Sequence, residues 1–69
     1  MHKIFFLNGH KYFTDDENVT LLKLVEYFDY NKSLLVIEYN NLICNKTYWN
    51  NIFINGNDKI EIITIVGGG

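Results

Sequence analysis

The first fourteen residues carry a strand pattern that is interrupted by one turn signal. The stretches KIFFL (3–7) and HKYFT (10–14) are rich in aromatic and branched residues, and Asn8 and Gly9 lie between them. An Asn-Gly pair tolerates the positive φ angles that a two-residue type I′ turn requires. The pattern therefore predicts a β-hairpin.

A helical period follows the polar loop DDEN (15–18). From Thr20 onward, apolar residues recur at spacings of three and four positions. These residues are Leu21, Leu24, Val25 and Phe28. The spacing predicts an amphipathic helix of about three turns, with Thr20 as its N-cap. The polar stretch DYNKS (29–33) breaks the pattern.

A second hairpin is predicted after the helix. LLVIEYN (34–40) has the character of a buried strand, and LIC (42–44) that of a short one, with a turn at Asn40 and Asn41. The stretch NKTYWNNIF (45–53) has no clean period. It predicts a short 3₁₀ or loop connection, with Trp49 folded back over the core.

The last strand is predicted over KIEIITIV (59–66), after the turn NGND (55–58). Side chains alternate between the two faces of a strand, so if Ile60 and Ile62 face the helix, Ile63 and Ile65 face away from it. One helix cannot cover both faces of a sheet in so short a chain. We therefore expect an exposed apolar strip formed by Ile63 and Ile65 that leads to the chain end, and a partner-docking patch that consists of Ile63, Ile65 and Val66.

This order of elements predicts an α+β domain of the β-grasp (ubiquitin-like) type. One helix packs across a mixed, curved sheet of four to five strands, with the first and last strands adjacent and parallel in the middle. We expect residues 1–66 to form this domain and residues 67–69 a flexible C-terminal glycine tail.

Composition narrows the function classes. A chain of 69 residues is one small domain, which makes a large enzyme pocket unexpected. The net charge is −2, arginine is absent and the lysines are scattered, so we expect no nucleic-acid partner. No apolar run is long enough for a secretory signal or for a membrane span, so we expect a soluble protein with no membrane partner.

The reactive side chains form no evident catalytic or metal-binding set, so we expect no catalytic residue, no metal and no bound cofactor. His2 and His10 are predicted to be surface residues, and the acidic run at 15–17 a solvated loop. Asp58 is expected to shape the turn before the last strand. Cys44 is the single cysteine, and we expect a small buried residue there instead of a nucleophile.

The chain ends in ITIVGGG, and three of its five glycines are Gly67, Gly68 and Gly69. The abundance of Asn, Ile, Lys, Tyr and Phe indicates AT-rich coding. Glycine codons are not favoured by such a bias, so the bias does not explain the three terminal glycines. A glycine run at a chain end can also be without function. On composition alone, both a functional glycine tail and a tail without function remain open.

The whole chain resembles the ubiquitin-like sulfur carriers of the ThiS family. The resemblance is carried by the LNG hairpin, the helix TLLKLVEYF, the middle segment VIEYNNLICNKTYW, the segment GNDKIEII and the final VGGG. Gly68 and Gly69 match the minimal Gly-Gly terminus of the family, and Gly67 is an extra glycine that some members share.

The resemblance implies a carrier that acts as a co-substrate and not as an enzyme. An E1-like (ThiF-like) enzyme would use ATP to adenylate the Gly69 carboxylate, and sulfur from a donor such as a cysteine desulfurase would convert it into a thiocarboxylate. Thiazole synthase (ThiG-like) would accept this sulfur for thiamin biosynthesis. Gly67 and Gly68 would thread into the partner, because a Cβ would restrict the backbone there.

Other functions compete with this one. A sulfur carrier of the type found in molybdopterin synthase shares the fold and the tail, and a ubiquitin-like protein modifier would use the same terminus. A β-grasp binding module would not need the glycines at all. The compartment expected for the carrier is the cytoplasm, or the plastid stroma if the gene is in a plastid.

Overall fold

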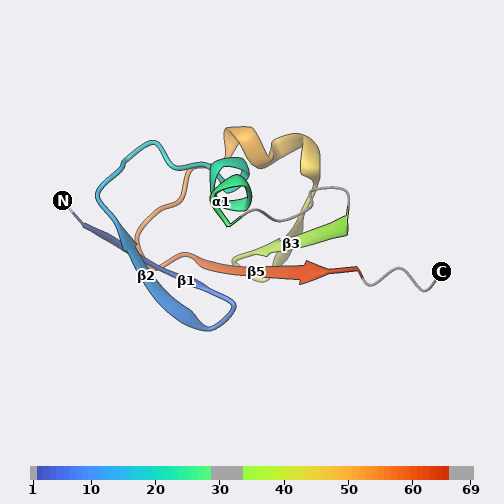
Figure 1. Cartoon of the computed structure of the whole chain (residues 1–69), viewed down its shortest axis with the longest axis horizontal. Coiled ribbons are helices and arrows are strands. Elements are labelled where there is room, and N and C mark those ends of the chain that lie inside the picture. The colour runs from blue at the N-terminus through green and yellow to red at the C-terminus, as the bar shows by residue number, and fades with distance from the viewer. Residues whose placement is uncertain (1, 29–33, 66–69) are drawn as a thin grey trace.

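The computed structural model describes residues 2–28 and 34–65. The elements that build the domain in this part of the chain are five strands, an α-helix and the 3₁₀ helix η2 (Figure 1). In chain order they are β1 (Lys3–Leu7), β2 (His10–Thr14), α1 (Leu21–Tyr27), β3 (Leu35–Tyr39), β4 (Leu42–Cys44), the 3₁₀ helix η2 (Lys46–Asn51) and β5 (Lys59–Thr64).

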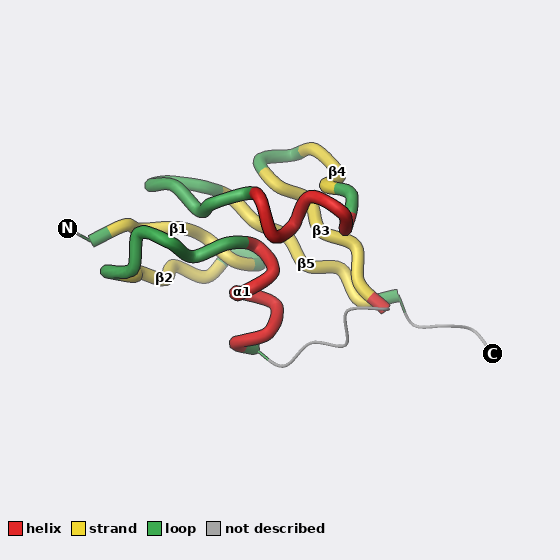
Figure 2. The backbone as a smooth tube through the Cα atoms, turned by 90° about the horizontal axis from the view of Figure 1, so that it is seen from above, coloured by secondary structure: helices red, strands yellow, loops and turns green. Residues whose placement is uncertain are grey.

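The strands form one mixed sheet in the order β2-β1-β5-β3-β4. β5 lies in the centre, parallel to β1 and antiparallel to β3. Both helices lie on the same side of the sheet, as Figures 1 and 2 show. This arrangement confirms the predicted β-grasp fold, with five strands and the first and last strands side by side.

The first hairpin turns at the predicted place. Asn8 and Gly9 have φ angles of 50° and 81°, as a type I′ turn requires. Asn8 also connects the hairpin to the centre of the sheet, because its Oδ1 accepts a hydrogen bond from the backbone N–H of Ile62 (2.7 Å). The turn therefore helps to fix β5 beside β1.

The α-helix begins where the sequence predicted and is shorter than predicted. The Oγ1 of Thr20 accepts a hydrogen bond from the N–H of Lys23 (3.1 Å), which confirms Thr20 as the N-cap. α1 has seven residues, about two turns, and Phe28 is its C-cap. The prediction of about three turns was wrong because Phe28, which continues the apolar spacing, packs against the core from beyond the last helical residue.

The core fills the space between the sheet and the two helices. Trp49 of η2 is 1% exposed and its Nε1–H donates to the carbonyl oxygen of Cys44 (3.1 Å), as expected for a side chain folded back over the core. It packs with buried residues from α1 and from the inner face of the sheet. The fully buried ones are Leu21, Val25, Ile37 and Ile60, together with Ile54 from the loop between η2 and β5.

Candidate functional site

The outer face of β5, opposite the helices, is apolar near the end of the strand. Ile60 and Ile62 are 0% and 7% exposed on the helix side, whereas Ile63 and Ile65 are 46% and 50% exposed. This confirms the predicted alternation of the two faces. Ile65 lies just beyond β5, and its N–H still donates to the carbonyl oxygen of Leu34 (2.7 Å), so the strand pairing continues to the last described residue.

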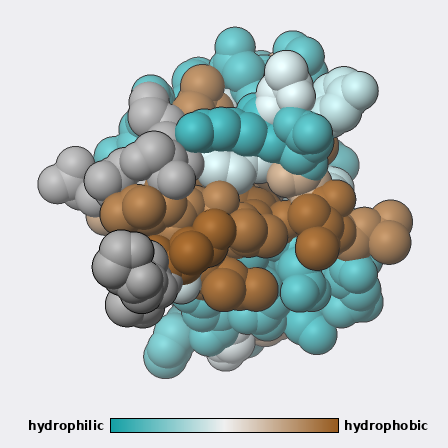
Figure 3. Space-filling model, turned by 90° about the vertical axis from the view of Figure 1, so that its right-hand side faces the viewer, coloured by the Kyte–Doolittle hydropathy of each residue, from teal (hydrophilic) through white to brown (hydrophobic). Residues whose placement is uncertain are grey.

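The neighbouring strands extend this surface. Val36 of β3 stands directly opposite Ile63 of β5, and Leu34, which pairs with Ile65, lies on the same face two positions before Val36. We call these residues, with Ile43 of β4, the outer patch: Leu34, Val36, Ile43, Ile63 and Ile65. Figure 3 looks at the end of the molecule toward which β5 runs and shows a continuous apolar band across it.

Two carboxylates border the outer patch. Glu38 of β3 and Glu61 of β5 stand directly opposite one another, and Ile43 of β4 flanks Glu38 on its other side. Both glutamates are half-buried. Lys59 comes two positions before Glu61 on the same face, but no ion pair within 4.0 Å joins either glutamate to a cation among residues 2–28 and 34–65.

The predicted tail follows this surface directly in the sequence. Val66, Gly67, Gly68 and Gly69 lie outside the described residues. Their predicted roles, as part of the docking patch, as the threading segment and as the sulfur-carrying terminus, therefore stay predictions.

The turn before β5 is held by a buried carboxylate. Asp58 is 7% exposed. Its Oδ2 accepts hydrogen bonds from the backbone N–H of Asn55 (2.7 Å) and the hydroxyl of Tyr39 (2.5 Å), and its Oδ1 accepts one from the Asn40 amide (3.1 Å). Burial, and then the hydrogen bond to Asp58, raise the pKa of Tyr39 to about 12. Asp58 thus shapes the turn, as predicted.

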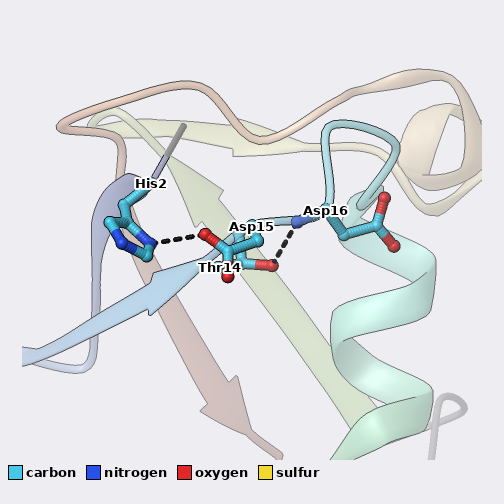
Figure 4. Close-up of polar contacts among 4 residues, drawn as sticks. All are labelled: His2, Thr14, Asp15 and Asp16. Carbon is cyan, nitrogen blue, oxygen red and sulfur yellow. Dashed lines mark hydrogen bonds and ion pairs between the residues drawn. The ribbon is translucent and has the colours of Figure 1, made fainter.

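The histidines lie at the surface, as expected. The imidazole of His2 points at the carboxylate of Asp15 (Figure 4), and these side chains are 68% and 71% exposed. In the same loop the N–H of Asp16 donates to Thr14 Oγ1 (3.1 Å). His10 is exposed beside the first turn. Within the described residues, no group of three or more His, Cys, Asp and Glu side chains could hold a metal ion.

Cys44 is far from this His–Asp pair in the sheet. It lies on the edge strand β4, whereas the loop with Asp15 follows the opposite edge strand, β2. The side chain is half-buried, less than the sequence suggested, and burial raises the pKa of its thiol. A raised pKa lowers the thiolate fraction at neutral pH, which disfavours a nucleophilic role.

Neither helix in the described ranges has the length and apolar character needed to cross a membrane. α1 and η2 have seven and six residues.

Comparison with known proteins agrees with this architecture. A solved structure described as the thiamine biosynthesis protein ThiS from Geobacter metallireducens superposes with a TM-score of 0.81 at 18% identity, covering 96% of this chain and 99% of that one. At 18% sequence identity, this similarity shows a shared fold and no more.

Sequence relatives come from three organisms, and each is described as the uncharacterized protein ycf40. The protein of Trieres chinensis is 60% identical over 67 residues, which are 97% of this chain and 90% of the relative. Those of Porphyra purpurea and Pyropia yezoensis are 40% and 35% identical over 63 residues, which are 91% of this chain and 87% of each relative.

The family match extends through the glycine tail. Residues 5–69 match the sequence profile of the ThiS family, from the first strand to the last glycine. The chain therefore belongs to the ThiS family.

Proposed function

We propose that this protein is a sulfur carrier for thiamin biosynthesis. The carboxylate of Gly69 is adenylated by an E1-like enzyme with ATP, which releases pyrophosphate. A sulfide equivalent from a donor then displaces AMP and leaves a thiocarboxylate, and thiazole synthase accepts that sulfur. The protein is a co-substrate in each step, and ATP binds to the partner.

One observation carries the proposal: an exposed apolar surface on the central strand leads directly into the glycine tail, and the family match includes both. Ile63 and Ile65 lie on the face without helices, and Gly67 follows two positions after Ile65. A docked outer patch would hold the domain while the tail reaches the nucleotide. Fixing each tail residue costs about 1–2 kcal/mol, and burial of the outer patch offsets that cost.

The described residues give little support for catalysis by the domain itself. The exposed His2–Asp15 pair has no cysteine near it, because Cys44 is on the opposite edge of the sheet. The segment before α1 offers Val19 and Thr20 in place of a glycine-rich phosphate loop. A role as substrate of another enzyme fits these features better than a role as catalyst.

The proposal is tested by the intact mass of the chain after incubation with a ThiF-like enzyme, ATP and sulfide. We expect a gain equal to the replacement of one oxygen by sulfur, located at Gly69. Gly69→Ala is the matched control, and it should remain folded and unmodified. An unchanged wild-type mass, with an enzyme that is active on its own carrier, would refute the proposal and favour a binding module.

The pathway is tested with a second enzyme. The thiocarboxylate form should support thiazole formation by thiazole synthase, and it should not replace the sulfur-carrying subunit of molybdopterin synthase. The opposite result would assign the carrier to the molybdopterin pathway. The proposed compartment is the cytoplasm or the plastid stroma.

A further inference from the structure

Glu38 and Glu61 form an arrangement that the fold itself does not require. They are directly opposed on β3 and β5, and like charges in this relation destabilise a sheet. Among the described residues, the contact between an imidazole and a carboxylate joins His2, which precedes β1, to Asp15 in the loop after β2, and it involves neither glutamate. Among the described residues no cation forms an ion pair within 4.0 Å of either carboxylate, and Lys59, two positions before Glu61 on the same face, is the next cation along the strand. The two carboxylates therefore face outward side by side as like charges.

The surroundings of this pair are apolar on the side of β4 and toward the end of β5, and polar toward Lys59 and Asn40 at the start of β5. Ile43 flanks Glu38 on β4, and Val36 and Ile63 form the next row of the sheet toward the chain end. A partner that covers the outer patch would also remove water from the two carboxylates. Without a positive charge on the partner, this desolvation would oppose docking.

We propose that Glu38 and Glu61 together bind a cationic side chain of the activating enzyme, most suitably an arginine, when the outer patch docks. This inference rests on the proposed function. A guanidinium offers five N–H donors in one plane, which suits two adjacent carboxylates, and an apolar surround strengthens such a contact. The partner surface is thus apolar with one cation at its border.

Charge complementarity favours this partner over a second copy of the chain. The chain contains no arginine, and its net charge is −2. In a contact between two identical chains, each copy would bring the same pair of glutamates. A cationic enzyme surface would instead place an opposite charge against that pair. Complementary charge at an interface also steers association and selects the correct partner.

The test is steady-state adenylation, followed by pyrophosphate release at varied carrier concentration. We expect Glu38→Gln/Glu61→Gln to raise the KM for the carrier about tenfold and Glu38→Lys/Glu61→Lys about a hundredfold or more, with kcat within about twofold of wild type. Glu17→Gln, which removes one charge from the loop after β2, is the control and should leave KM unchanged.

Thermal unfolding separates docking from folding. Because the opposed charges repel, the Gln/Gln variant should have a Tm equal to wild type or about 2 °C higher, although it docks less well. Added salt should lower kcat/KM for wild type and have less effect on this variant. A purely structural pair would give a lower Tm together with the higher KM.

The outcomes of these experiments distinguish the cationic contact from the sulfur-carrier function. If wild type is adenylated and the Lys/Lys variant has an unchanged KM, the cationic contact is refuted and the sulfur-carrier function stands. A rise in KM that is fully explained by a lower Tm refutes it as well. If wild type is not adenylated by an active enzyme, the proposed function fails, and this inference fails with it.

Discussion

Four isoleucines at the end of the chain form two pairs that differ in surroundings and not in chemistry. Ile60 and Ile62 are 0% and 7% exposed beneath the helices, whereas Ile63 and Ile65 are 46% and 50% exposed on the opposite face. Position along a strand decides which pair is buried, because successive side chains point to opposite faces. The inner pair stabilises the fold, and the outer pair forms the exposed surface for which we propose a docking role.

The largest predicted effect tests the inner pair. Ile60→Ala should lower the free energy of unfolding by about 3 kcal/mol, since it removes buried methyl groups and leaves a cavity in a closely packed core. Ile63→Ala should lower it by less than about 1 kcal/mol, because that side chain already contacts water. Urea denaturation of both variants measures the difference. Equal losses would mean that the outer face is also part of the core.

The next effect concerns the turn that sets where β5 begins. Asp58→Ala should lower the free energy of unfolding by about 2 kcal/mol, because three part-buried hydrogen bonds, from Asn55, Asn40 and Tyr39, lose their acceptor. Asp16→Ala is a matched control, since its carboxylate accepts one exposed hydrogen bond from the N–H of Asn18. It should cost about 0.5 kcal/mol. A similar cost for both would show that the Asp58 contacts contribute little.

Most of the framework followed from local signals in the sequence. Asn8-Gly9 marked the first turn, Thr20 marked the helix start, and alternation separated Ile60 from Ile63. These predictions succeeded because each depends on a few neighbouring residues. The bond from Asn8 Oδ1 to the N–H of Ile62 connects residues 54 positions apart in sequence, and no local pattern could reveal it.

The candidate site was only partly predictable for the same reason. Ile63 and Ile65 were identified from the period of one strand, but Leu34, Val36 and Ile43 join them through the register of β3 with β5 and β4. The segment LLVIEYN (34–40) has the pattern of a buried strand, yet alternation within it places Leu34 and Val36 on the outer face. The Glu38–Glu61 pair likewise appears only when the strands are aligned.

The third prediction tests the outer pair. Ile63→Ala/Ile65→Ala should raise the KM for adenylation about tenfold, equivalent to about 1.4 kcal/mol of docking, because apolar contact area is lost. The Tm should change by only a few degrees. Phe13→Ala is the control: Phe13 is 71% exposed, but it lies on the opposite edge strand. The same rise in KM for Phe13→Ala would show that docking does not depend on the outer patch.

The smallest effect belongs to Tyr39, which pairs with Ile60 across β3 and β5. Burial and the contact with Asp58 raise the pKa of Tyr39 from 10.0 to about 12 in the folded protein. The folded state therefore favours the neutral phenol. The resulting stability is present below about pH 10 and is lost as the pH rises toward 12.

Tyr39→Phe should remove the part of the loss of stability at alkaline pH that is due to Tyr39. It should also lower the free energy of unfolding at neutral pH, because Asp58 loses one hydrogen-bond donor. Since Tyr39 is only half-buried, the loss of unfolding free energy that it causes at alkaline pH should be less than about 1 kcal/mol after screening by solvent. Urea unfolding of both proteins between pH 9 and pH 11.5 measures it, and the other tyrosines, which both share, cancel. Identical slopes would mean that Tyr39 ionises equally in the folded and unfolded chains, and that the inner face of the sheet admits water at the start of β5.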